Sequence, residues 1–307
     1  MREFTVYAPA KLNLYLDVLE KRPDGYHNIK TLFEKIDLKD RIIIREKTRG
    51  LDVKVEGSMP CPSGKDNIVY KALKALFKEA ATEISLEVII EKRIPVSAGL
   101  GGGSSDAAAA LRSINEQFGL GVSFERLFSI GAEQGKDIPF FMLDAPFARG
   151  LGAGEILEPV DTDFMLWHVV INPDVSISTS EMYKRLDSHN QGSKRNGIEK
   201  TVSAIKNKDI SLLEKAYYNI FEEVLDDDYG PYIDRAKALL LKACTGPCFL
   251  SGSGPSVFCT LKDKKEATKI LKKIPREKGV NTFLATTYKG GIYGDNRGQD
   301  ISQRRIE

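Results

Sequence analysis

Apolar and polar residues alternate along much of the first third of the chain, which is the pattern of strands with one buried face. The clearest alternation is that of Leu12, Leu14, Leu16 and Val18. The pattern as a whole predicts strands at 5–7, 12–18, 42–44, 51–55 and 86–90. We expect these strands to form an antiparallel or mixed sheet.

Helical spacing replaces this alternation in three segments of the first half. Asn67 is a favourable N-cap, and apolar residues recur every three or four positions over 69–80 after it. A second apolar face runs along 107–118. A third helix is predicted over 123–135, where a serine stands at the start and a glycine at the end.

The second half mixes the two patterns. Strands are predicted at 165–171 and 282–288, with two short strands on either side of a glycine loop at 251–256. The predicted helices cover 180–187, 198–224, 231–243 and 264–273. This mixture favours an α+β sandwich over a doubly wound sheet.

A change in composition near the middle of the chain predicts two domains. The glycine-rich stretch 147–155 leads to Glu158 and Pro159, and such residues punctuate two periodic regions. We therefore predict one domain over 1–158 and another over 159–290. Residues 291–307 are polar and aperiodic, and we expect them to form a loose tail.

Composition and charge narrow the classes of function. The 307 residues include 45 basic and 43 acidic side chains, and no block of like charge is long enough to bind a nucleic acid. No apolar run is long enough to cross a membrane, and the N-terminus lacks the layout of a secretory signal. We expect a cytoplasmic protein with a small-molecule partner. Its four cysteines have no zinc-site spacing and are expected to be reduced.

The densest chemical signal is the run P-V-S-A-G-L-G-G-G-S-S-D-A at 95–107. Glycine loses more backbone entropy on folding than any other residue, so such a cluster needs a compensating use. The N–H groups of a glycine-rich turn and of a helix start can converge on an anion. With Ser104 or Ser105 as the cap of the following helix, the run predicts a phosphate site. A tight turn before a buried helix is the alternative.

Two common nucleotide-binding loops do not fit this sequence. A Walker A loop requires GxxxxGK[ST], and Lys136 after Gly135 is followed by Asp137 instead of a hydroxyl residue. A Rossmann loop requires a third glycine at the position that Ser104 occupies, and a βαβ unit that the meandering strands do not provide.

The glycine run resembles the phosphate-binding motif of the galactokinase, homoserine kinase, mevalonate kinase and phosphomevalonate kinase (GHMP) superfamily. Supporting motifs are A-P-A-K-L-N-L-Y-L at 8–16, R-P-D-G-Y-H-N at 22–28, G-K-D-I-P-F-F at 135–141 and S-G-S-G-P-S-V-F at 251–258. The first two of these are similar to the members that phosphorylate a cytidine-diphosphate-linked methylerythritol in non-mevalonate isoprenoid synthesis. The resemblance covers residues 5–260 and leaves the tail after Gly290 uncovered.

The resemblance implies a fold and a reaction. The fold is α+β, with an N-terminal domain like domain 2 of ribosomal protein S5, a ferredoxin-like C-terminal domain, and the active site between them. The reaction transfers a phosphoryl group from ATP, with Mg²⁺, to the 2-hydroxyl of the diphosphocytidyl substrate.

Two side chains that the resemblance marks as catalytic also have an unusual sequence context. Lys11 interrupts an apolar strand pattern, and a lysine facing inward needs an anion beside it; an exposed strand lysine is the alternative. Asp137 precedes Ile138 and Pro139 at a predicted helix end, where an ordinary turn aspartate is the alternative. The resemblance implies that these two groups act together on the reacting hydroxyl.

The resemblance also implies binding residues. Those for the substrate are Asn13, Tyr26, His27, Tyr183, Gly252 and Gly254, of which the last two fit a hairpin turn equally well. Those for ATP are Asn67, Ile68, Pro95, Gly99, Leu100, Gly101, Gly102, Gly103, Ser104 and Ser105. Ser104 and Ser105 can be helix caps only, and the ligands of Mg²⁺ are left open.

Three further residues have no assigned contact with ATP or substrate. Asp106 suits a helix N-terminus but would repel phosphate, so we expect it to be a cap or to support a binding residue. His168 and His189 are left without a role. The oligomeric state is also left open.

Two rival functions remain at this point. A sister kinase for mevalonate, homoserine or a sugar would share the glycine run but would not need Tyr26 and Tyr183. A nucleotide-binding module without chemistry would not need Lys11 and Asp137.

Overall fold

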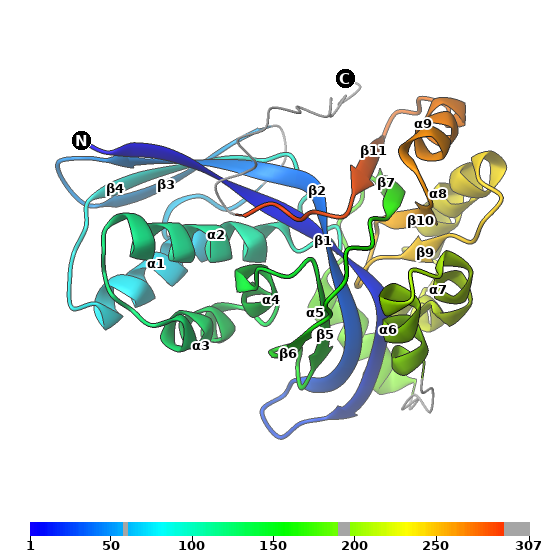
Figure 1. Cartoon of the computed structure of the whole chain (residues 1–307), viewed down its shortest axis with the longest axis horizontal. Helices are drawn as coiled ribbons and strands as arrows, with labels where there is room; N and C mark the ends of the chain where they lie inside the picture. Colours follow the sequence, from blue (N-terminus) through cyan, green and yellow to red (C-terminus); the bar gives the residue numbers. More distant parts are fainter. Residues whose placement is uncertain (58–60, 190–196, 292–307) are drawn as a thin grey trace.

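A computed structural model describes residues 1–57, 61–189 and 197–291 of the chain. Two sheets organise these residues, one of seven strands and one of four. Figure 1 shows them side by side, each with its own set of helices. The predicted tail lies outside the described residues from position 292 onward.

The larger sheet has the order β3-β4-β2-β1-β8, and a β5-β6 hairpin pairs with β2. Only the β3–β4 and β1–β8 pairs are parallel, so the sheet is mixed, as the alternation predicted. Its strands are β1 (Glu3–Lys21), β2 (His27–Glu46), β3 (Leu51–Glu56), β4 (Leu86–Glu91), β5 (Phe147–Leu151), β6 (Ile156–Pro159) and β8 (Tyr218–Asn219).

The first two strands are much longer than the sequence pattern predicted. The segments 5–7 and 12–18 form one strand, β1, with register shifts at Pro9/Ala10 and Asn13/Tyr15 that interrupt the simple alternation. In β2 only 42–44 was predicted, because buried charged residues such as Glu34 and Asp40 hide its pattern.

Four helices cover one face of the larger sheet (Figure 1). They are α1 (Ile68–Glu79), α2 (Gly102–Gln117), α3 (Phe124–Gln134) and α4 (Ile138–Met142), and a short 3-10 turn, η1 (Gly64–Asp66), precedes α1. The predicted caps Asn67 and Ser123 each accept a backbone N–H, from Val69 and Arg126. The predicted end of α3 at Gly135 is confirmed as well.

The stretch 147–155, predicted as the crossing to a second domain, is instead part of the β5-β6 hairpin on the larger sheet. Gly152 takes a positive φ in its turn. The boundary after residue 158 stays a prediction.

The smaller sheet is antiparallel, with the order β11-β7-β10-β9. Its strands are β7 (Trp167–Pro173), β9 (Phe249–Leu250), β10 (Val257–Leu261) and β11 (Val280–Thr286). The helices of this half are α5 (Thr179–Ser188), α6 (Ile198–Lys206), α7 (Ile210–Ala216), η2 (Ile220–Val224), α8 (Gly230–Ala243) and α9 (Lys264–Lys273).

The single helix predicted over 198–224 is wrong, because the segment breaks twice. Lys208 adopts a φ of 56°, and Asp209 then caps α7 by accepting the N–H of Leu212 at 2.9 Å. After α7 the chain extends as β8 and pairs with β1 at Tyr15 and Leu16. The apolar periodicity is present in the sequence. The cap at Asp209 and the pairing of β8 with β1 nevertheless interrupt the helix.

A shared core joins the two sheets. It contains Leu12 and Leu14 of β1, Val170 of β7 and Phe258 of β10. A bridge between Ile36 and Thr287 adds a backbone link from β2 to the chain just after β11. The two halves are therefore packed against one another, which fixes the geometry of anything bound between them.

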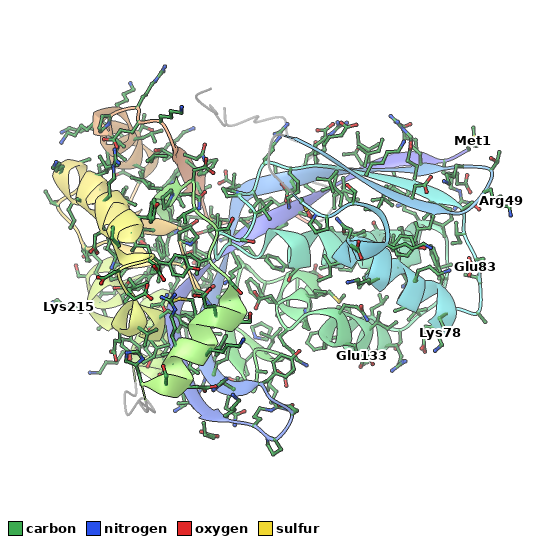
Figure 2. All side chains as sticks on the ribbon, turned by 180° about the vertical axis from the view of Figure 1, so that it is seen from behind. Met1, Arg49, Lys78, Glu83, Glu133 and Lys215 are labelled. Carbon is green, nitrogen blue, oxygen red and sulfur yellow. The ribbon has the colours of Figure 1, made fainter. Side chains whose placement is uncertain are left out.

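Figure 2 shows the molecule from behind, with its side chains as sticks. Met1, Arg49, Lys78 and Glu83 mark one end of the molecule, and Lys215 marks the other. Over the described ranges, no helix has the length and apolar character needed to span a bilayer.

Candidate active site

The glycine run forms the turn between β4 and α2. Gly99 and Gly101 adopt φ values of 75° and 69°, a region that favours glycine. Ser104 or Ser105 was predicted to cap this helix, and that prediction is wrong. The helix begins at Gly102 with Gly101 as its N-cap, so both serines lie inside its first turn. The first N–H group of this segment that donates a helical hydrogen bond is that of Ser105, to Gly101 O at 3.0 Å. The N–H groups before it are free for a ligand.

A buried charge cluster lies beneath this turn. Lys92 donates to Asp40 Oδ2 and to Asp106 Oδ2, the latter at 2.9 Å. Asp40 Oδ1 also accepts the backbone N–H of Ile94 at 2.9 Å, which ties the cluster to the start of the glycine run. Burial alone would lower the pKa of Lys92, but the two carboxylates outweigh it and raise the pKa. Asp106 therefore supports the turn and caps nothing.

The state of Asp106 follows from its surroundings. Burial raises the pKa of Asp106 to about 8, and Asp40 adds to this shift while Lys92 opposes it. The Lys92 ammonium lies beside both carboxyl groups and offsets part of their charge.

Lys11 and Asp137 approach one another across the cavity. Lys11 lies in the middle of β1, and its Nζ is 4.0 Å from Asp137 Oδ2. Burial lowers the pKa of Lys11, and the Asp137 carboxylate opposes that shift. Lys11 Nζ also donates to Asn13 Oδ1, and Asn13 Nδ2 donates to Thr31 Oγ1 at 2.8 Å. The lysine and the amide are therefore held in fixed positions.

Asp137 stands directly before the short helix α4, whose position depends on a second buried lysine. Ile138 N donates to Gly135 O at 3.1 Å and closes the turn around Asp137. At the other end of α4, Lys35 Nζ donates to the carbonyl oxygens of Leu143 and Phe141. Burial lowers the pKa of Lys35 to about 7. Lys35 thus holds α4 in place, and with it the adjoining residue Asp137.

The glycine loop between β9 and β10 packs against the first one. Ser251 Oγ donates to Gly99 O at 3.0 Å, and a Cβ on Gly99 would lie only 2.0 Å from Ser251 O. Asn219 Nδ2 donates to Leu250 O and Gly252 O, both at 2.8 Å, from the buried end of β8. The two loops, which meet through residues 152 positions apart in sequence, therefore form one rigid wall.

Aromatic side chains gather at the other end of the cavity. The rings of His27 and Tyr183 stack with centroids 5.1 Å apart and planes inclined by 23°. Tyr26 is half exposed, and Lys136 Nζ lies 4.9 Å from its ring centroid. His27 Nε2 lies 2.7 Å from Asp187 Oδ1.

The glycine turn, the Lys11–Asp137 pair and the aromatic side chains line one cavity of about 750 Å³. Its lining includes, of the residues predicted from the sequence, Lys11, Asn13, Tyr26, His27, Ile68, Pro95, Gly99, Gly101, Gly102, Gly103, Ser104, Asp137, Tyr183 and Gly252. Four predicted residues, Asn67, Leu100, Ser105 and Gly254, lie outside the lining. Their binding roles stay predictions.

The positions of those four have physical reasons. Asn67 is buried as the cap of α1, and Leu100 belongs to the core that joins the two sheets. Ser105 is buried in the first turn of α2, and Gly254 packs toward Leu250.

The sequence reasoning missed several residues that shape the site. Lys92 interrupts the end of a strand pattern, the same signal that pointed to Lys11, but its partners Asp40 and Asp106 cannot be found from spacing. Asn219 and Asp187 gave no signal, because an isolated polar residue near a helix is usually solvated.

The sequence and the fold both match known proteins. Residues 67–153 match the profile of the "GHMP kinases N terminal domain", and residues 201–281 match that of "GHMP kinases C terminal". The fold is similar to a homoserine kinase from Cytophaga hutchinsonii, with a TM-score of 0.69 and 19% identity over 94% of this chain and 95% of that one. The protein is a kinase of the GHMP class, with its two-domain mixed α and β fold.

Closer relatives share a more specific name. Proteins called 4-diphosphocytidyl-2-C-methyl-D-erythritol kinase are 39% identical in Geobacter metallireducens (87% of this chain, 92% of the relative) and 36% identical in Listeria monocytogenes (87% and 90%). A crystal structure of 4-(cytidine 5'-diphospho)-2C-methyl-D-erythritol kinase has a TM-score of 0.76 and 28% identity, over 93% of this chain and all of that one. The chain belongs to the 4-diphosphocytidyl-2-C-methyl-D-erythritol kinase family.

Proposed function

We propose that this protein transfers the γ-phosphoryl group of ATP to the 2-hydroxyl of 4-diphosphocytidyl-2-C-methyl-D-erythritol, a step of non-mevalonate isoprenoid precursor synthesis. The observation that carries the proposal is the Lys11–Asp137 pair, 4.0 Å apart, in one cavity with the glycine turn. Phosphoryl transfer needs mainly positioning and charge stabilisation, and these groups supply both.

The phosphates of ATP would bind at the start of α2. The N–H groups from Gly101 to Ser104 line the cavity, and the positive end of the helix dipole lies there. Lys92 also lines the cavity, and its ion pairs with Asp40 and Asp106 hold the start of the glycine run in place. Together they would hold the triphosphate with its terminal group toward Asp137.

Asp137 would take or orient the proton of the attacking hydroxyl. Its carboxylate is partly exposed, and both Asp137 and Lys11 line the cavity. A cation beside a carboxylate favours the ionised form, which is the form that accepts a proton. Lys11 would also stabilise charge on the transferred group, while Asn13 would hydrogen-bond the acceptor.

Mg²⁺ would come with the nucleotide, and when bound it neutralises charge on the phosphate oxygens. Within the described ranges, no group of three or more His, Cys, Asp or Glu side chains could hold a metal ion. Magnesium sites commonly use few protein oxygens together with substrate phosphates and water, and the Ser104 hydroxyl beside the glycine turn fits that donor set. Ser104 would therefore hold the ion from the protein side.

The cytidine part of the acceptor would bind at the aromatic end of the cavity. Tyr26 and Tyr183 offer ring faces for stacking, and His27 offers polar groups for the base edge. Gly252, braced by Asn219, lies between this end and the glycine turn and would approach the diphosphate. We further propose that the protein acts in the cytoplasm on small molecules alone.

The test is a substrate panel. 4-Diphosphocytidyl-2-C-methyl-D-erythritol, mevalonate, homoserine and galactose are each supplied with ATP and Mg²⁺, and ADP release is followed. We expect turnover with the first substrate alone. Turnover restricted to one of the others would identify a sister kinase, and nucleotide binding without turnover on any of the four would identify a non-catalytic module.

A further inference from the structure

A carboxylate from α5 holds one nitrogen of the His27 ring. Asp187 Oδ1 lies 2.7 Å from His27 Nε2, and its other oxygen, Oδ2, accepts from Lys21 Nζ. The hydrogen bond from Lys21, together with that from His27, lowers the pKa of Asp187. The carboxylate is therefore ionised at neutral pH.

An ionised carboxylate can only accept hydrogen bonds. His27 Nε2 must then carry a proton and donate it to Asp187. A neutral imidazole has one protonated nitrogen, so in that form of the ring Nδ1 has the lone pair and is an acceptor. No contact of Nδ1 with another side chain is found across the described part of the chain, and His27 lines the cavity.

The plane of the ring is fixed as well. The His27 side chain is only 8% exposed, and its ring stacks on Tyr183. Tyr183 in turn packs edge-on against Phe221, with ring centroids 5.1 Å apart. The Nδ1 lone pair therefore has a fixed direction.

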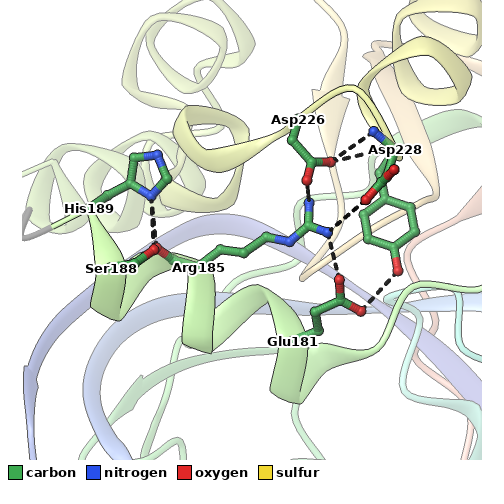
Figure 3. A network of polar contacts seen from close by, with 7 residues as sticks. Glu181, Arg185, Ser188, His189, Asp226 and Asp228 are labelled. Carbon is green, nitrogen blue, oxygen red and sulfur yellow. Dashed lines mark hydrogen bonds and ion pairs between the residues drawn. The ribbon is translucent and has the colours of Figure 1, made fainter.

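The helix that carries Asp187 and Tyr183 is anchored by a network around Arg185 (Figure 3). Arg185 binds Glu181 on its own helix and Asp226 and Asp228 on the turn before α8. At its start, Thr179 Oγ1 lies 2.9 Å from Ser253 Oγ, beside the second glycine loop. The carboxylate of Asp187 is thus presented by a rigid helix.

We propose that Asp187 is a positioning residue that keeps the proton on His27 Nε2, so that Nδ1 accepts a hydrogen bond from the exocyclic amino group of a 4-aminopyrimidine base. A uracil base has a carbonyl oxygen at that position, and two acceptors facing one another repel. Asp187 would therefore set the preference for cytidine over uridine, through His27. The proposal rests on the proposed function, because it assumes that the base lies at this end of the cavity.

The substitution Asp187→Asn reverses the arrangement without changing its shape. Lys21 donates to the Oδ2 side and needs an acceptor there, so the amide oxygen of asparagine faces Lys21. The NH₂ group then faces His27 and donates to Nε2, which moves the ring proton to Nδ1. The lone pair that would receive the amino group is lost, and a donor that suits a carbonyl takes its place.

The experiment compares kcat/KM for cytidine-diphosphate-linked and uridine-diphosphate-linked methylerythritol. In Asp187→Asn we expect the ratio to fall by about tenfold or more, because a site built to pair with one polar group discriminates strongly against its opposite. The change should lie in KM for the cytidine substrate, with KM for ATP unaltered. Nitrogen-15 NMR of labelled histidine should show the ring proton moving from Nε2 to Nδ1.

A matched control is Asp163→Asn. Asp163 is also an aspartate paired with a lysine, Lys208, but it is exposed and lies outside the cavity. Its substitution should leave the ratio unchanged.

An unchanged ratio in Asp187→Asn, or an equal loss for both substrates, would overturn the proposal. Failure of the proposed function would look different: the wild-type protein would not use the cytidine substrate, while the NMR spectra would still report which nitrogen of His27 carries the proton beside Asp187.

Discussion

Lys11 and Asp137 are brought within 4.0 Å of each other by two elements whose shapes differ completely. Lys11 projects from the middle of a 19-residue strand, whereas Asp137 precedes a helix of 5 residues. Neither element could hold the pair alone. On the strand, Asn13 holds Lys11 in position. The short helix is held by Lys35.

The first prediction concerns the carboxylate of this pair. Asp137→Asn keeps the shape of the side chain but removes its ability to accept a proton. We expect kcat to fall by about 10² to 10⁴, the range for losing a proton-handling group, while ATP binding stays close to that of the wild-type protein. Single-turnover kinetics and calorimetric titration with a non-hydrolysable ATP analogue would measure the two effects.

Asp144→Asn provides the matched control for this change. Asp144 lies beyond the other end of α4, is largely exposed, and pairs with Arg112 at 2.9 Å. The Asp144→Asn variant should keep kcat within about threefold of the wild-type value, as expected of a surface substitution. Equal losses in the two variants would mean that Asp137 acts through the stability of α4 and takes no part in the reaction.

At the scale of elements, the two glycine loops depend on the absence of a side chain at Gly99. A Cβ there would meet Ser251 O at 2.0 Å, and the φ of 75° is strained for any other residue. We predict that Gly99→Ala lowers the free energy of unfolding by about 3 kcal/mol, the sum of strain and overpacking. It should also raise KM for ATP, because the loop must move away from its place.

Gly121→Ala separates these two contributions. Gly121 has a similar φ of 68°, but nothing lies within 4 Å of the added Cβ. We expect a loss of about 1 kcal/mol, from strain alone, and no change in KM. Urea unfolding of both variants would decide: similar losses would show that the contact between the loops adds nothing to stability.

Elements with strong local signals were predictable from the sequence. The helices that begin at Asn67 and Ser123 have both a cap and an apolar face, and they lie where the pattern put them. The strand β2 was largely missed, because Glu34, Lys35 and Asp40 read as solvent-exposed residues and yet are buried with partners far away in sequence. Local patterns hold no information about such partners.

The candidate site also contains residues that could be predicted from the sequence and residues that could not. Its glycine turn, Lys11 and Asp137 could be named from residue type and motif, and the cavity contains all three. The groups that hold them in place could not be named. Asp40 reaches Lys92 across 52 positions, and Asn219 reaches Gly252 across 33, and only the folded chain brings them together.

At the scale of the whole molecule, a buried carboxylate and a buried imidazole meet where the two sheets pack together. Glu34 of β2 and His168 of β7 are both fully buried, with Oε2 and Nε2 3.0 Å apart. Thr287 Oγ1 donates to the other oxygen of Glu34 at 2.7 Å, and Thr260 Oγ1 lies 3.2 Å from His168 Nδ1. A histidine that the sequence left without a role is therefore part of the junction between the halves.

We predict that His168→Leu lowers the free energy of unfolding by about 3 kcal/mol, because it leaves a buried carboxylate without the polar side chain beside it. The double variant Glu34→Met/His168→Leu should recover at least half of the loss, since an apolar pair of similar volume needs no partner. The only tryptophan, Trp167, adjoins His168 and reports the transition by fluorescence.

The exposed His189 gives the comparison for this experiment. It is bonded to Arg185 O on the surface, and His189→Leu should change stability by less than about 0.5 kcal/mol. If the double variant were as unstable as His168→Leu, the loss would come from packing and not from an unpaired charge.

The contact between the two glycine loops also has a consequence for how the protein is made. A ribosome releases Lys11 and the first loop long before it reaches Ser251, which braces Gly99, and Asn219, which braces Gly252. The nascent chain therefore holds an unfinished pocket until its last third has emerged. Translation fragments that stop earlier lack the wall on which productive nucleotide binding depends, so they consume no ATP.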